Sequence, residues 1–167
     1  MENLEGVSIV DSHVHFAGVG CHASTFANGD VLGAYVDSCG TTFRNPRSGG
    51  CSGSDLKQDM KNLNISEVVF VECGLASPLE EASWAIGQAT AGNYIIKKVV
   101  AHVPMTEGAK AVSKFLDRLN LKDGSLPCCL AGGREVYQLG YSNPKFNLCL
   151  SPEYTSSLEV LEAHGLL

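Results

Sequence analysis

Three ionisable side chains alternate near the N-terminus, where Asp11, His13 and His15 stand at and just beyond the end of the apolar run Gly6–Asp11. The run is rich in β-branched residues and predicts a strand covered on both faces. Because side chains alternate across a strand, all three should point to one side. Two neutral imidazoles on one side can bind a single divalent metal such as Zn, Fe, Ni or Mn. The simpler alternative is ordinary polar residues where a strand meets a loop, since short motifs often match by chance.

Two later apolar runs also carry ionisable residues near their ends. Glu72 lies in the run Val68–Cys73, and His102 lies in the run Val99–Val103. Both runs predict buried strands, and the active site of a parallel barrel lies at the carboxyl ends of its strands. Both side chains could therefore face one cavity, although each could equally be a strand-end residue satisfied within the protein. Two weaker candidates are His22 and Glu135.

Strand and helix signals alternate along the chain. A Ser-Pro pair opens two predicted helices, which is typical of an N-cap with proline at the first helical position. The predicted helices are Ser54–Leu63, Ser77–Gly92, Gly108–Leu119 and Ser151–Gly165, and the predicted strands are Gly6–Asp11, Val68–Cys73, Ile95–Val103 and Cys128–Ala131. Four apolar residues share one face of the third helix: Val112, Phe115, Leu116 and Leu119. Alternating helices and doubly buried strands predict an α/β fold with a parallel sheet.

The composition sets the size and class of the protein. The 167 residues are 44% hydrophobic and 18% charged, enough for one core, so we expect a single unit over residues 1–167 with a poorly patterned insertion at about 17–53. The net charge of -6 argues against nucleic acid and anionic membranes as partners. Neither a leader-like N-terminus nor a membrane-length apolar stretch is present, which favours a cytoplasmic protein acting on a small molecule.

The cysteines do not form a recognisable framework. There are seven, at positions 21, 39, 51, 73, 128, 129 and 149, without Cys-x-x-Cys spacing. An odd and scattered set fits neither a disulfide scaffold nor a zinc ribbon. We expect reduced thiols, several of them buried as small apolar side chains. No base or electropositive setting near Cys73 or Cys128 supports a nucleophilic role.

The segment Ile9–Phe16 resembles the first-strand signature of the amidohydrolase superfamily, an Asp-x-His-x-His at the end of an apolar strand. Later segments resemble, by their order and spacing, the amidohydrolase-related branch, which includes lactonases and decarboxylases. Those segments are Ser54–Leu56 leading into Val68–Glu72, then Val99–Pro104, then Leu130–Glu135. The last of them is similar to the Gly-x-Arg that follows the fourth strand of that branch. The resemblance runs from about Val7 to the C-terminus and matches poorly at 17–53.

The resemblance implies a partial TIM-type (β/α) barrel with about four of its eight βα units. His13 and His15 would be metal ligands, most readily for zinc, or hydrogen-bond donors to substrate in members that work without metal. Arg134 would match a position that binds a substrate carboxylate or ring oxygen, a task suited to the guanidinium fork. Its alternative is a surface arginine in a glycine-rich loop. Glu72 and His102 are further substrate-binding candidates where they face the same cavity, and the implied activity is hydrolysis of a small carboxylate-bearing ring, such as a sugar lactone.

The resemblance also implies what this chain lacks. A complete barrel has eight βα units in roughly 250 residues. The family takes its remaining ligands and its catalytic carboxylate from later strands, for which this chain has no counterpart. We therefore expect a truncated half barrel with two exposed strand edges, of marginal stability unless two copies pair as a homodimer. The alternative function is a non-catalytic half barrel that serves as a binding or dimerisation module.

Overall fold

Four parallel strands form one sheet, and their order in space, β1-β2-β3-β4, is their order in the sequence. The computed structural model describes residues 7–15, 56–58, 61–72, 77–91, 95–135 and 148–166. In chain order the elements are β1 (Ile9–Val14), β2 (Ile65–Val71), α4 (Pro78–Thr90), β3 (Ile96–His102), α5 (Ala109–Leu119), β4 (Leu130–Arg134) and α6 (Pro152–Ala163). Single 3-10 turns at Met105–Glu107 and Leu148–Leu150 precede α5 and α6. The predicted α/β class with a parallel sheet is confirmed.

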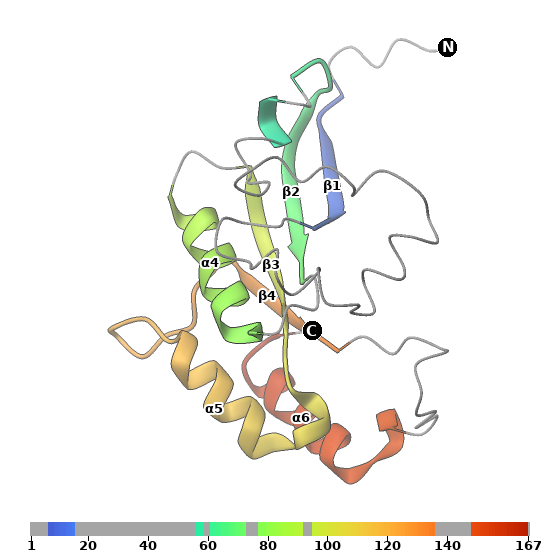
Figure 1. Ribbon diagram of the computed structural model, residues 1–167, viewed down its shortest axis with the longest axis vertical. Helices are drawn as coiled ribbons and strands as arrows, with labels where there is room; N and C mark the ends of the chain where they lie inside the picture. The colour runs from blue at the N-terminus through green and yellow to red at the C-terminus, as the bar shows by residue number, and fades with distance from the viewer. Residues whose placement is uncertain are drawn as a thin grey trace.

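The register brings the carboxyl ends of neighbouring strands to within two residues of one another. Val14 lies beside Phe70, Val71 beside Val100, and His102 beside Arg134. Residues that end different strands are therefore neighbours along one edge of the sheet, as Figure 1 shows for the strand ends.

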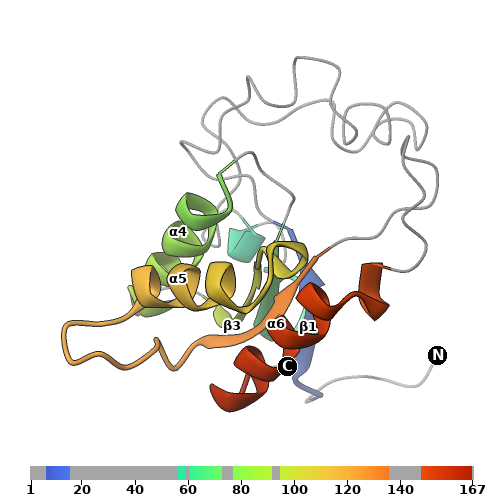
Figure 2. The same cartoon turned by 90° about the horizontal axis from the view of Figure 1, so that it is seen from below.

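The helices pack beside the sheet one after another. Figures 1 and 2 show α4 alongside β3, then α5, then α6. Under α4, the ring of Phe70 meets Trp84 edge to face with centroids 6.2 Å apart. The side chains between sheet and helices form the core, and the fully buried ones include Val68, Phe70, Val99, Ala101 and Leu116. All four residues of the predicted apolar face of α5 are buried, which confirms that prediction.

Strand β1 is less covered than the sequence predicts. Its run was expected to be buried on both faces, but Ile9 is 37% exposed and Val10 is 52% exposed. β1 lies at the edge of the described sheet and is hydrogen-bonded to β2 alone. An edge position leaves fewer neighbours to cover a β-branched run, so the expectation of double-sided burial is wrong for this strand.

Several predicted boundaries move. β4 runs over Leu130–Arg134 rather than Cys128–Ala131, so Arg134 ends a strand instead of following it in a loop. The first predicted helix is helical at residues 56–58 but turns at residues 61–63, short of the predicted end. Ser77 precedes α4 as predicted but accepts no side-chain capping bond, whereas Ser151 accepts one from the Tyr154 amide at 3.1 Å. Predictions about His22, Ser54, Cys73, Gly92 and the insertion at 17–53 fall outside the described residues.

Close packing explains the displacement of β4. The pair Gly132-Gly133 reads as a loop in the sequence, yet both glycines lie in the strand. A Cβ added at Gly133 would lie 2.7 Å from Cγ2 of Val103 and 3.2 Å from Cδ1 of Leu161. Gly133 therefore lets β4 and α6 approach closely, which a larger residue would prevent.

Three cysteines fall within the described residues, at 128, 129 and 149, and each is a free thiol. Cys129 is buried, and burial raises the pKa of its thiol. Cys128 and Cys129 precede β4 rather than lying in it. None of the described helices is long and apolar enough to cross a membrane.

Candidate strand-end site

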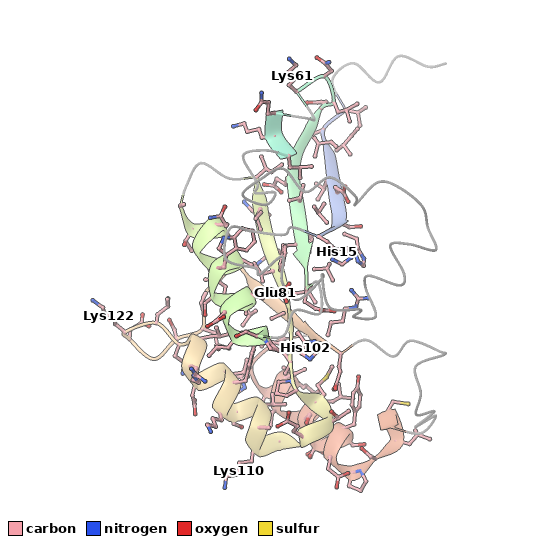
Figure 3. All side chains as sticks on the ribbon, in the orientation of Figure 1. His15, Lys61, Glu81, His102, Lys110 and Lys122 are labelled. Atoms are coloured by element: carbon pink, nitrogen blue, oxygen red, sulfur yellow. The ribbon has the colours of Figure 1, made fainter. Side chains whose placement is uncertain are left out.

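The structure brings the sequence-predicted site residues to one edge of the sheet. His13 lies in β1 and His15 follows its last residue; Glu72 follows β2; His102 and Arg134 end β3 and β4. Figure 3 labels His15 and His102 near the carboxyl ends of their strands. In a parallel sheet these ends form the side on which active sites are built. The arrangement follows from register and topology, since residues of similar position on neighbouring strands must lie close together.

Glu72 is the buried centre of this edge. Its side chain is fully buried, and its two carboxylate oxygens face two different bases. Oε1 lies 3.5 Å from Nη1 of Arg134, and Oε2 lies 3.7 Å from Nδ1 of His102. Both separations exceed an ordinary hydrogen bond, so the attraction is mainly ionic. Burying a carboxylate is costly unless charged partners offset the loss of water, and here one partner ends the neighbouring strand β3 and the other ends β4, the strand beyond it.

The imidazole of His102 is set by its acidic surroundings. The interaction with the Glu72 carboxylate is the largest influence and raises the pKa of His102 above its usual value, against the opposing effect of burial. Glu135 and Glu81 add smaller contributions in the same direction. Glu81 is a buried residue of α4, labelled in Figure 3. His102 is therefore suited to hold a proton near neutral pH and to present it at the strand ends.

His13 and His15 face each other across the end of β1. Their Nε2 atoms are 3.1 Å apart, and the rings meet edge to face. Nδ1 of His15 lies 2.9 Å from the carbonyl oxygen of Val71. Because a carbonyl can only accept, that nitrogen carries the proton, and the Nε2 lone pair of a neutral His15 is directed toward His13. Asp11 meets the pair at the backbone: its Oδ1 accepts a hydrogen bond from the backbone N–H of His13 at 3.1 Å.

The histidine pair has a geometry that two ligands of one metal could share. Two nitrogens bound at about 2.1 Å to a tetrahedral zinc ion are about 3.4 Å apart, close to the 3.1 Å found here. Anchoring of Nδ1 to a backbone carbonyl is the usual outer contact of a metal-binding histidine. Partial burial, followed by the charges of His15 and Arg134, lowers the pKa of His13, which favours the neutral form that binds metals. Within the described ranges, however, no group of three or more potential ligands assembles.

A contact that the sequence did not single out secures the neighbouring loop. The Glu135 carboxylate accepts from the backbone N–H of Thr106 at 2.9 Å and from its hydroxyl at 2.7 Å. Glu135 was a weak candidate in the sequence, and Thr106 was not a candidate at all. The only available signal was the acidic residue directly after Arg134. His164, by contrast, is exposed at the end of α6 and is not part of this site.

The comparisons with known proteins address the fold. No protein-family model and no curated protein matches the chain. Among solved structures, the chain is similar to a probable 2-pyrone-4,6-dicarboxylic acid hydrolase from Acinetobacter baumannii with citric acid bound. The TM-score is 0.54 and the sequence identity is 14%, over 95% of this chain and 47% of that one. This chain therefore spans about half the length of the matched structure, and its fold is that of a partial TIM-type barrel.

Proposed function

We propose that this chain forms part of the active site of a hydrolase of the amidohydrolase-related family, acting on a small carboxylate-bearing ring such as a sugar lactone. The observation that carries the proposal is the convergence of His15, Glu72, His102 and Arg134 on one carboxyl edge, with Glu72 buried among its bases. The sequence resemblance and the similar fold of a dicarboxylic acid hydrolase support it. The net charge of -6 favours a small substrate over nucleic acid, and we expect the protein to act in the cytoplasm.

Arg134 is the residue that would hold the substrate carboxylate. Its side chain is 34% exposed, so only part of the guanidinium is engaged by Glu72. The remaining N–H groups form the planar fork that binds a carboxylate through two hydrogen bonds. Glu72 would act on the substrate through Arg134 by fixing the orientation of that fork.

His102 would donate a hydrogen bond to a substrate oxygen. Its Nδ1 faces Glu72, which leaves Nε2–H as the second donor of the protonated ring. Because the pKa of His102 is raised, the ring keeps this proton up to a higher pH than an isolated histidine would. Together with Arg134 it adds positive charge where an anionic substrate would bind.

His13 and His15 would act at the scissile carbonyl in one of two ways. A divalent ion, with zinc as the first candidate, would supply Lewis acidity toward that carbonyl when held by the two Nε2 atoms. Without metal, His13 would donate a hydrogen bond to the same oxygen by turning toward it the Nε2–H that faces His15 in the free protein.

The substrate proposal is tested by measuring acid release from sugar lactones with and without a ring carboxylate. We expect the chain to hydrolyse the carboxylate-bearing lactones preferentially. Arg134→Lys should lower kcat/KM by about 10- to 100-fold, because a charge-assisted bidentate contact is lost. Arg118→Lys, on the exposed side of α5, is the matched control and should have no effect. Equal rates on neutral lactones, or full activity in Arg134→Lys, would contradict the proposal.

The metal proposal is tested separately by titrating the chain with zinc in a calorimeter. We expect binding in the unmodified chain and a large loss in His13→Ala and in His15→Ala. His164→Ala removes an exposed imidazole at the end of α6 and should bind zinc as the parent does. Unchanged zinc affinity in both His13→Ala and His15→Ala would show that these residues are not zinc ligands. Their hydrogen-bonding role would then be tested by the lactone assay.

A second candidate is a non-catalytic module that pairs with another copy of itself. The exposure of Val7, just before β1, and of Ile9 and Val10 within it is the observation that favours it, since β1 is an edge of the described sheet and exposed apolar edges associate readily. Measuring the mass in solution by light scattering tests it. A dimer without lactone hydrolysis would favour the module, and an active monomer would favour the enzyme.

A further inference from the structure

We propose that Glu135 is a positioning residue of the strand-end site: by holding Thr106, it fixes the turn that follows β3 and with it the facing pair His102 and Arg134. The role of this contact in substrate binding rests on the proposed function, whereas its role in fixing the turn does not.

The contact joins the ends of two strands. Glu135 directly follows the last residue of β4, and Thr106 lies in the 3-10 turn Met105–Glu107 that follows β3. Both carboxylate oxygens are used, one by the Thr106 amide and one by its hydroxyl. A two-point contact to a charged acceptor fixes both the distance and the orientation of the turn.

The same turn is anchored from its other side by α6. The hydroxyl of Ser157, a fully buried residue, lies 2.8 Å from the carbonyl oxygen of Met105 and 2.9 Å from that of Glu153, so its one proton is shared between the turn and α6 itself. Between the two anchors, the backbone N–H of Val103 donates to the carbonyl of Arg134 at 3.1 Å, which extends the β3–β4 pairing by one step. The backbone on both sides of His102 and Arg134 is thus held by specific contacts rather than by an open loop.

This placement matters because His102 and Arg134 are cross-strand partners that share Glu72. Their charged groups meet it at 3.7 and 3.5 Å, distances that a small shift of either strand end would change. The charged groups that act on His102 come from three elements besides its own strand: Glu72 after β2, Glu81 on α4 and Glu135 after β4. Glu135 therefore influences His102 both through the turn and through its charge.

The test separates these two influences by NMR, with no substrate present. Glu135→Gln removes the charge and weakens the contact, whereas Thr106→Val removes the hydroxyl bond and keeps the charge. Thr106→Ser keeps both bonds and is the matched control. The readouts are the hydrogen exchange rates of the amides of residues 103 and 106 and the pH titration of the His102 ring.

We expect Glu135→Gln to speed exchange at both amides by about tenfold or more, as loss of a charge-assisted hydrogen bond implies, and to lower the pKa of His102. Thr106→Val should speed exchange in the same direction and shift the His102 resonances, and Thr106→Ser should match the parent. A change of pKa in Glu135→Gln with unaltered exchange would make Glu135 only a nearby charge and overturn the inference. If Glu135→Gln fails to fold, exchange in Thr106→Val decides; parent-like exchange there overturns it. Failure of the lactone assay alone would count against the proposed function and not against this contact.

Discussion

Replacing Gly133 with Ala should destabilise the protein because the new methyl group has no room. Its carbon would lie 2.7 Å from Cγ2 of Val103 and 3.2 Å from Cδ1 of Leu161. Carbon atoms in contact normally lie about 3.5–4.0 Å apart, so β4 must move away from Val103 by about 1 Å. Overpacking of this kind costs about 1–3 kcal/mol of unfolding free energy.

Gly87→Ala is the matched control, because the same substitution should have the opposite sign there. Gly87 lies inside α4, and a Cβ at that position would meet nothing within 4 Å. Alanine loses less conformational freedom than glycine on entering a helix, so we expect a gain of about 0.5–1 kcal/mol.

Urea denaturation followed by circular dichroism measures both effects. For a small protein the unfolding free energy changes by about 1–3 kcal/mol per molar urea, so the Gly133→Ala midpoint should fall by about 1 M. The Gly87→Ala midpoint should rise by a smaller amount. A Gly133→Ala protein as stable as its parent would refute the close packing of β4 against Val103 and α6.

Two further predictions use the caps and the titrating histidine. Ser151→Ala should cost about 1 kcal/mol of unfolding free energy, because it removes the capping bond of α6, whereas Ser77→Ala at α4 should be nearly neutral; urea midpoints that fall equally would contradict this difference. Glu72 raises the pKa of His102 above its unfolded value of about 6.5, so the protonated ring adds stability that is complete below that pH and is lost as pH rises through the folded pKa. The stability difference between the parent and His102→Gln, measured by urea at pH 5 to 8, should therefore shrink as pH rises, and a constant difference would contradict the ion pair.

Elements held by local contacts were predictable from the sequence. The helical spacing of apolar residues in α5 predicted the four residues that are buried, because the apolar face of a helix is the face that packs on the core. Local signals failed where two similar motifs differ in backbone shape. Ser151 has the extended backbone of an N-cap, with φ -71° and ψ 148°, whereas Ser77 has φ -122° and ψ 83° and makes no side-chain cap.

The candidate site was predictable as a set of strand ends but not as a set of contacts. Glu72 and His102 were named because they lie near the ends of apolar runs, and parallel topology then brings such residues together. The boundary of β4 was missed because Gly133 packs closely against Val103 and α6, a tertiary effect that strand propensity does not contain. The contact between Glu135 and Thr106 depends on a 3-10 turn that no pattern in the sequence predicts.

The limited cover of β1 gives the two parts of the site different local stabilities. His13 and His15 stand at the end of β1, which in the described sheet pairs with β2 alone, whereas Glu72, His102 and Arg134 stand at the ends of strands that contact helices: β2 and β3 contact α4, and β4 contacts α6. Any ligand that touches both parts must add its binding free energy to the docking of β1, by RT ln(1 + [L]/Kd). A ligand that binds more tightly then also stabilises the docking of β1 more strongly. The amides of β1 should gain protection from hydrogen exchange as such a ligand saturates the site, while those of β3 change little.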